Sequence, residues 1–138
     1  MSGDMRILVI DDMAVMRKIV VKQLENLGYK NIETAENGKD GLAKILDGVK
    51  NNNPVQFIIS DWNMPEMSGL ELLKTLKSKK PLADIPFLMV TAEGEKDQIM
   101  AAIAAGVTNY VVKPFSPNTF KEKMDLVLKK VGLPATPA

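Results

Sequence analysis

Five short apolar runs, separated by stretches with helical periodicity, most constrain the fold of this chain. The runs are Ile7–Ile10, Ile32–Ala35, Phe57–Ile59, Phe87–Val90 and Tyr110–Val112. Each run is short enough for one strand, and the second is more polar than the others. Continuous apolar strands that alternate with amphipathic helices predict a parallel sheet with helices on both faces.

The intervening stretches carry apolar residues at three- and four-residue spacing, as helices with one buried face do. These stripes are Met16, Val20, Leu24 and Leu27; Leu42, Ile45, Leu46 and Val49; Leu70, Leu73 and Leu76; Ile99 and Ile103; and Phe120, Met124, Val127, Leu128 and Val131. Gly28 is expected just beyond the end of the first helix. The pattern predicts an α/β fold, a flavodoxin-like (βα)5 doubly wound parallel sheet with strand order 2-1-3-4-5 and the polar second strand at an edge.

Length and charge limit the organisation of the chain. With 138 residues, we expect one domain over residues 1–131 and a flexible C-terminal tail over 132–138. The N-terminal sequence MSGDMRILVIDD resembles neither a signal peptide nor a membrane span, so a cytoplasmic location with no membrane contact is expected. The net charge of +1 gives no basic excess for nucleic-acid binding.

The chain contains no cysteine and no histidine. Disulfides, thiol chemistry and imidazole bases are therefore excluded. Ionic chemistry must use carboxylates, lysines and hydroxyls. Oxygen ligands of this kind favour a hard cation such as Mg²⁺ or Ca²⁺.

Polar residues stand at the carboxyl ends of four predicted strands. They are Asp11 and Asp12 after the first, Asp61 after the third, Thr91 after the fourth and Lys113 after the fifth. Ligands of open α/β sheets bind beyond these ends, next to the point where the strand order reverses. Three carboxylates would meet there and repel one another unless a cation lies among them.

A magnesium site follows from this convergence. Asp12 and Asp61 suit direct ligation of Mg²⁺, Asp11 can act directly or through water, and the backbone carbonyl of Asn63 can add another oxygen. An aspartate can also act as a nucleophile and form an aspartyl phosphate. Mg²⁺, the ammonium group of Lys113 and the hydroxyl of Thr91 would then stabilise the charge on the phosphoryl oxygens.

Each of these residues alone has an ordinary structural explanation. Asp12 can cap the first helix, Thr91 can cap the fourth, and Tyr110 can be a partly buried strand aromatic. Their order along the chain and their common place at strand ends favour a functional site.

The strings ILVIDD, SDWNMPEMSGLELLK, MVTAE and YVVKPF resemble the receiver domains of response regulators, and in particular the chemotaxis members of that family. The resemblance extends from Met5 to Val131. It implies a two-component signalling protein that a sensor histidine kinase phosphorylates on Asp61, with Mg²⁺ at Asp11, Asp12, Asp61 and the carbonyl of Asn63. It further implies a monomer without enzymatic turnover of an external substrate. Its partners would be a flagellar motor switch protein and, in addition, a phosphatase.

The resemblance also assigns a switch and an output face. Thr91 and Tyr110 correspond to the switch pair, and the output face corresponds to the fourth helix, fifth strand and fifth helix. The matching output residues are Ile99, Val112, Phe115 and Lys123, and Asn63 and Glu93 match positions that tune dephosphorylation. Glu95 and Leu126 stand where lysines are usual, which lowers the positive charge available for an acidic target.

Two other functions remain open from the sequence. One is a receiver that serves as a phosphate sink or relay intermediate rather than binding the motor. The other is a Mg²⁺-dependent phosphohydrolase with an aspartyl nucleophile, similar to the haloacid-dehalogenase family. That family places an Asp-x-Asp pattern after the first strand, whereas Asp11 and Asp12 are adjacent here.

Overall fold

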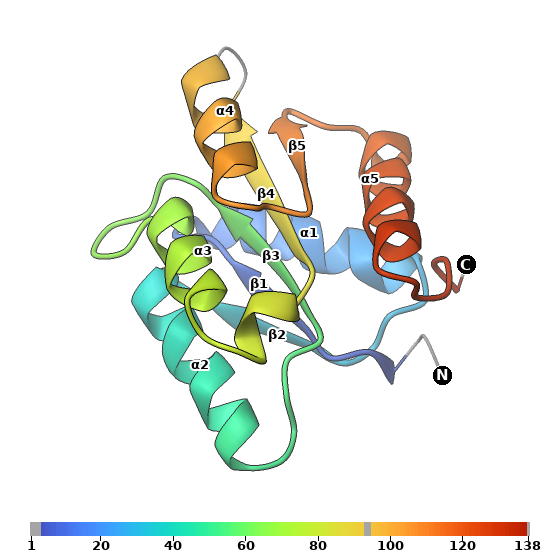
Figure 1. Ribbon diagram of the computed structural model, residues 1–138. Coiled ribbons are helices and arrows are strands. Elements are labelled where there is room, and N and C mark those ends of the chain that lie inside the picture. Colours follow the sequence, from blue (N-terminus) through green and yellow to red (C-terminus); the bar gives the residue numbers. More distant parts are fainter. Residues whose placement is uncertain (1–3, 93–94, 138) are drawn as a thin grey trace.

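The computed structural model describes residues 4–92 and 95–137, and in it five parallel strands form one sheet (Figure 1). The strands are β1 (Ile7–Ile10), β2 (Ile32–Ala35), β3 (Phe57–Asp61), β4 (Phe87–Ala92) and β5 (Asn109–Lys113). Their order is β2-β1-β3-β4-β5, so the flavodoxin-like prediction and the edge position of the polar strand are confirmed.

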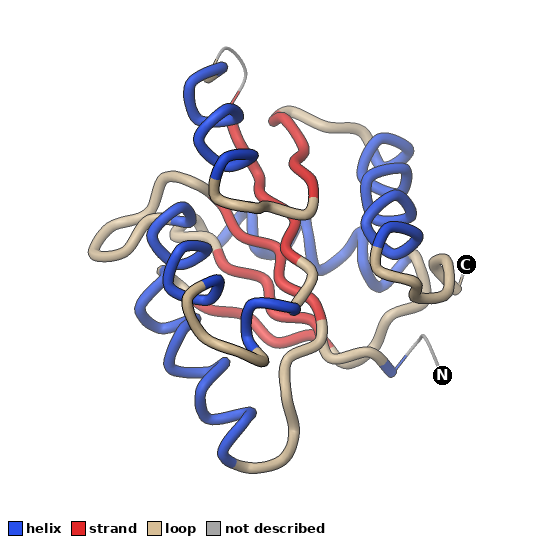
Figure 2. The backbone as a smooth tube through the Cα atoms, in the orientation of Figure 1, coloured by secondary structure: helices blue, strands red, loops and turns tan. Residues whose placement is uncertain are grey.

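Helices cover both faces of this sheet, as the tube in Figure 2 shows. They are α1 (Ala14–Asn26), α2 (Gly38–Lys50), α3 (Gly69–Lys77), the short 3₁₀ helix η2 (Leu82–Asp84), α4 (Lys96–Ala104) and α5 (Pro117–Lys130). Helices α1 and α5 cover one face, whereas α2, α3 and α4 cover the other. The architecture is therefore a three-layer α/β/α sandwich.

The core divides into two parts because side chains alternate across each strand. Ile7 and Val9 of β1 pack with Val20 and Leu24 of α1 and with Phe120 of α5. On the opposite face, Leu8 and Ile10 of the same strand pack toward α2, α3 and α4. All four residues of β1 are at most 1% exposed, as expected for a central strand covered on both sides.

Local sequence signals place the helix ends. Ser68 and Glu71 form a capping box at the start of α3. Gly28 follows α1 with a φ of +98°, a left-handed conformation that favours glycine, so the predicted end of this helix is confirmed.

The helical stripes were only partly correct as predictions of the core. Leu46, Val49, Ile103 and Val131 are exposed, because each lies at the margin of its stripe and turns away from the sheet. Helix α4 instead buries Ala102, which allows the helix backbone to lie close to the sheet.

The two capping alternatives were wrong. Helix α1 begins after Met13 and has no side-chain cap from Asp12. Thr91 lies inside β4, and the residue that precedes α4 is Glu95. Both side chains are therefore free of a capping role.

The C-terminal residues lie against α5. The N–H of Leu133 donates to the carbonyl of Leu128 at 2.8 Å, and the N–H of Thr136 donates to Asp125 Oδ1 at 3.1 Å. The flexibility of residues 132–138 stays a prediction. Among the described residues, no helix has the length and apolar character needed to cross a membrane.

The two neighbours Ile45 and Leu46 on α2 test this packing. Ile45 is fully buried, whereas Leu46 is 42% exposed. We expect Ile45→Ala to lower the free energy of unfolding by about 2–5 kcal/mol, because it leaves a cavity under α2. The matched Leu46→Ala should change it by about 0.5 kcal/mol or less. Urea unfolding measures both, and equal losses would contradict the orientation of this helix.

Candidate functional site

The carboxyl ends of four neighbouring strands bring the predicted site residues to one edge of the sheet. Asp11 and Asp12 follow β1, Asp61 ends β3, Thr91 lies near the end of β4, and Lys113 ends β5. Residues from distant parts of the sequence, Asp11 and Lys113 at its extremes, thus meet at the edge that the strand order predicts.

Asp61 and Lys113 are in direct contact. Lys113 Nζ lies 3.2 Å from Asp61 Oδ1 and 3.9 Å from Asp11 Oδ2. Asp61 Oδ1 also accepts a hydrogen bond from the backbone N–H of Trp62 at 3.0 Å. The second oxygen, Oδ2, accepts no hydrogen bond from the described part of the chain, so one carboxylate oxygen is held and the other is free to react.

Two hydrogen bonds from residues at the start of α1 hold Asp11 in place. Its Oδ1 accepts a hydrogen bond from the N–H of Met13 at 2.9 Å, and its backbone carbonyl accepts one from Arg17 Nη1 at 2.7 Å. These contacts hold the loop after β1 against the start of α1. Asp12 next to it is exposed.

The carboxylates are crowded and buried, and this raises their proton affinity. Burial, with a further contribution from the charge of Asp11, raises the pKa of Asp61 to about 6. Burial also raises the pKa of Asp11, although the N–H of Met13 and Lys113 oppose the shift. One lysine is therefore not enough to balance the negative charge at this edge.

A divalent cation fits this set of oxygen ligands. Asp11, Asp12 and Asp61 each offer one carboxylate oxygen, and these atoms lie within 4.8 Å of one another. Oxygens this close together could bind one Mg²⁺ ion, which would offset their mutual repulsion. The donor set consists only of carboxylates, which matches Mg²⁺ rather than a softer metal.

Thr91 provides a buried hydroxyl beside the acids. The residue is fully buried, and its Oγ1 has no hydrogen-bond partner among the described residues. Its neighbour Val90 pairs with Asp61 in the register of β3 and β4. An unpaired buried hydroxyl is costly, and a ligand oxygen at this site would satisfy it.

Comparisons with known proteins agree with this geometry. A sequence profile of the response regulator receiver domain matches residues 7–125. The chain belongs to the response regulator receiver family. It is 44% identical to chemotaxis protein CheY1 of Helicobacter pylori over 124 aligned residues. The alignment covers 90% of this chain and 97% of that protein. It is also 44% identical to a chemotaxis protein CheY homolog of Campylobacter jejuni, over 90% of this chain and 92% of the homolog.

Solved structures show the same fold. The chemotaxis response regulator CheY4 of Vibrio cholerae has a TM-score of 0.75 at 33% identity and covers 93% of this chain and 98% of its own. A receiver domain protein from Clostridium thermocellum has a TM-score of 0.75 at 25% identity, over 92% of this chain and 94% of its own. Together, the family and these relatives point to a signalling domain rather than a catalytic enzyme.

The receiver residues expected at the output face are only partly brought together. Lys123 Nζ lies 4.8 Å from the centre of the Tyr110 ring, a cation–π distance. Phe115 stacks on Phe120 with ring centres 5.5 Å apart, so it packs on the core. Ile99 and Val112 are half-buried, and their output role stays a prediction.

Of the two positions expected to tune dephosphorylation, Asn63 is among the described residues and Glu93 is not. Asn63 is exposed in the loop after β3, and its Oδ1 accepts a hydrogen bond from Gln98 Nε2 at 3.4 Å. Its role as a carbonyl ligand stays a prediction. Glu93 lies outside the described residues. The Lys113–Pro114 peptide bond is cis.

Three supporting residues were not singled out from the sequence. A Cβ on Gly69 would overlap the carbonyl oxygen of Asp61, so only glycine lets α3 begin this close to the acceptor strand. Ser60 Oγ donates to the same carbonyl at 3.0 Å, and Gln98 reaches Asn63 from α4. The glycine directly after the helix-capping Ser68 was the only available signal. The hydroxyl of Ser60 bonds within β3 itself, and the contact of Gln98 joins α4 to the loop after β3.

Replacing Asp61 by Asn tests the electrostatics of this receiver site. The pKa of Asp61 in the folded state, about 6, lies above its unfolded value, so the stabilisation from protonating it is present below pH 4 and is lost as the pH rises through 6. We expect Asp61→Asn to raise the free energy of unfolding by about 1–2 kcal/mol near pH 7.5 in metal-free buffer, after a discount for solvent screening.

Urea unfolding at about pH 4 and about pH 7.5 measures this difference. Near pH 4 the variant and the wild type should be almost equally stable. The exposed Asp47→Asn on α2 controls for the loss of one negative charge. A variant that gains nothing over this control at the higher pH would contradict the account.

Proposed function

We propose that this chain is a chemotaxis response regulator that accepts a phosphoryl group on Asp61 from a histidine kinase and then signals by binding another protein. The contact of 3.2 Å between Lys113 Nζ and Asp61 Oδ1, beside the Asp11–Asp12 pair, carries the proposal. A buried carboxylate, a lysine ammonium group in contact with it and two further acids nearby support the roles of nucleophile, cation and metal ligands. The chemotaxis role is supported by relatives that are 44% identical over 90% of this chain.

The proposed reaction is a displacement at phosphorus. Asp61 Oδ2 attacks the phosphorus of a phosphohistidine, the new O–P bond forms as the P–N bond breaks, and the histidine leaves with the electron pair. Asp11, Asp12, Asp61 and the carbonyl of Asn63 would hold Mg²⁺, which supplies charge neutralisation on the phosphoryl oxygens when bound. The hydrogen bond from Trp62 N–H keeps the attacking carboxylate oriented.

Lys113 and Thr91 have separate parts in this reaction. Lys113 Nζ already touches Asp61, and it is positioned to bind a phosphoryl oxygen once the aspartate is modified. Thr91 Oγ1 lacks a partner, and donating to a second phosphoryl oxygen would satisfy it. A shift of Thr91 toward the phosphoryl group would carry the change at Asp61 into β4. The next residue of β4, Ala92, pairs with Lys113 of β5.

The signal is proposed to leave through α4, β5 and α5. Tyr110 would turn inward behind Thr91, which changes the contact of its ring with Lys123. A flagellar motor switch protein is the proposed target, as for a chemotaxis regulator. Glu95 and the exposed Leu126 make this face less basic and more apolar, which favours a target that is less acidic than a lysine-rich face would need.

Phosphorylation by a small donor tests the acceptor. With Mg²⁺ and acetyl phosphate, intact-mass spectrometry should show the gain of one phosphoryl group, because Asp61 Oδ2 is free to attack. Asp61→Asn should gain none, and Asp47→Asn, on the exposed face of α2, should behave as the wild type. Omission of Mg²⁺ should abolish the gain. A stable gain in Asp61→Asn under the same conditions would refute the assignment.

Lys113→Ala tests the coupling of the site to the output face. We expect the variant to fold, because Lys113 is at the surface edge of the sheet, but to lose the response to phosphorylation. Backbone amide shifts of α4, β5 and α5 should move on phosphorylation in the wild type and stay within a tenth of that change in Lys113→Ala. Lys121→Ala, which removes a lysine paired with Asp125 on α5, is the control. A wild-type response in Lys113→Ala disproves the role.

A further inference from the structure

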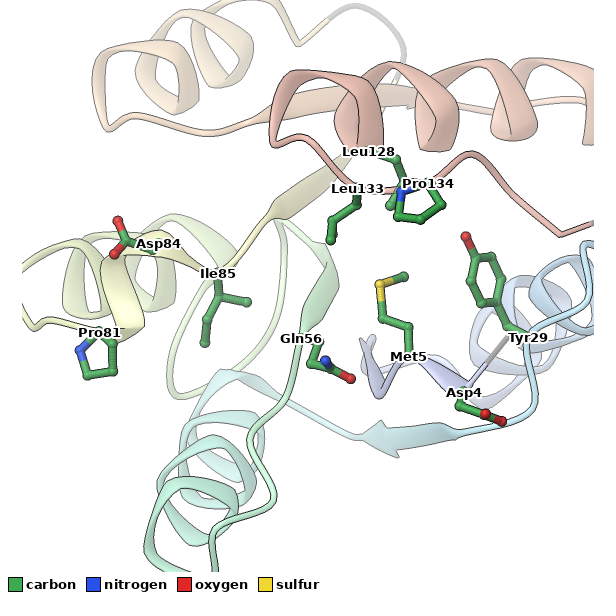
Figure 3. A pocket seen from close by; sticks show the side chains of 10 residues that line it. All are labelled: Asp4, Met5, Tyr29, Gln56, Pro81, Asp84, Ile85, Leu128, Leu133 and Pro134. Atoms are coloured by element: carbon green, nitrogen blue, oxygen red, sulfur yellow. The ribbon is translucent and has the colours of Figure 1, made fainter. Parts of the chain in front are cut away.

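A second pocket lies at the opposite edge of the sheet from the acidic site. It has a volume of about 630 Å³ and opens where β1, β3 and β4 begin, beneath the end of α5 (Figure 3). This volume is within the range of small-molecule sites in proteins. The pocket and the carboxyl edge lie at opposite ends of these strands. Each strand has four or more residues, which puts the two sites about 13 Å or more apart.

The walls of this pocket are largely apolar. Met5 and Leu128 line it and are almost fully buried, and Ile85, Leu133 and Pro134 add further apolar surface. In Figure 3, Leu128, Leu133 and Pro134 lie together on one wall and Met5 lies on the facing wall. Figure 3 shows Met5 and Leu133 pointing into the same space from opposite walls. An apolar body is the ligand chemistry that such walls favour.

One buried polar group stands among these walls. Tyr29 is 1% exposed, and its hydroxyl has no hydrogen-bond partner among the described residues. Burial, helped by the charge of Asp125, raises the pKa of Tyr29 to about 12, so the hydroxyl remains a donor at neutral pH. A buried donor without an acceptor is costly, and a ligand acceptor would remove that cost.

The C-terminal segment covers this hydroxyl. In Figure 3 the Tyr29 hydroxyl points toward Pro134. In the described part of the chain, the backbone N–H groups of Gly132, Leu133 and Thr136 tie this segment to α5. An acceptor would reach the Tyr29 hydroxyl by displacing Pro134, which is exposed.

The rim of the pocket sets the charge of its ligand. Asp4 and Asp84 are both exposed at the rim, and among the described residues no lysine or arginine lines the pocket. The side chain of Arg6, the arginine nearest in sequence to Asp4 and Met5, is paired with Glu33 on β2. Two carboxylates without a cation disfavour an anion.

We infer that this pocket binds a small uncharged organic molecule with an apolar body and one hydrogen-bond acceptor, which receives the hydroxyl proton of Tyr29. The site is independent of the phosphoacceptor site. Its specificity comes from one hydrogen bond and from the repulsion of anions at the rim, and its affinity comes from the apolar walls.

Three probes of the same naphthalene body test this inference on the full chain. They are 2-acetylnaphthalene, its isostere 2-isopropenylnaphthalene, which lacks the acceptor, and the anion 2-naphthoate. Titrations followed by ¹H–¹⁵N chemical shifts should move the amides of Met5, Tyr29, Ile85, Leu128 and Leu133. The acetyl compound should bind about threefold to tenfold more tightly than its isostere, and the anion more weakly than both.

Tyr29→Phe removes only the unpaired hydroxyl, so it should fold and bind the two neutral probes with equal affinity. Leu133→Trp should fill the pocket and weaken both at least fivefold, whereas the exposed Val131→Trp next to it should not. Asp61→Asn should leave all affinities unchanged, which separates this site from the proposed phosphorylation. No shifts at these residues, equal binding of the neutral probes to the wild type, or an unchanged preference in Tyr29→Phe would each overturn the inference.

Discussion

The contact between Lys113 Nζ and Asp61 Oδ1 links β5 to β3 at the edge where three carboxylates meet. Asp61 is 6% exposed, so its charge has little water to stabilise it, and the neighbouring Asp11 adds repulsion. The ammonium group of Lys113 offsets part of this cost. The pKa of Asp61 stays raised because burial and the charge of Asp11 outweigh that contact. The site is therefore built to gain from a divalent cation and from a change in the charge of Asp61, which are the two events that a receiver uses.

The rest of the fold keeps these charges together. Asp11 and Asp61 follow or end two strands, β1 and β3, that are buried on both faces, so their backbones have no freedom to separate them. Gly69 lets α3 approach the Asp61 carbonyl, and the capping box of Ser68 and Glu71 sets where that helix begins. The acceptor is thus rigid, whereas Thr91 has an unsatisfied hydroxyl and Tyr110 is only half-buried. A fixed carboxylate next to an unsatisfied hydroxyl and a half-buried ring is consistent with the proposed switch.

Much of this arrangement could be predicted from the sequence because it depends on periodic patterns and on strand ends. The periodic patterns predict the parallel sheet, and right-handed crossovers favour the strand order that brings Asp11, Asp12 and Asp61 together. What could not be predicted depends on distances between separate elements. Ile103 fits an apolar stripe yet is exposed, because the orientation of α4 is decided by the small Ala102. The overlap of Gly69 with Asp61 and the unpaired hydroxyl of Tyr29 are likewise visible only once the helices are packed.

The central claim is that Asp61, rather than either of its acidic neighbours, becomes the acyl phosphate. Borohydride reduces an aspartyl phosphate to homoserine at the modified residue, and peptide fragmentation by mass spectrometry locates that residue. After phosphorylation with Mg²⁺ and a small donor, the account predicts homoserine at position 61 and unchanged aspartate at positions 11 and 12. Homoserine at position 11 or 12, with Asp61 unmodified, would contradict it.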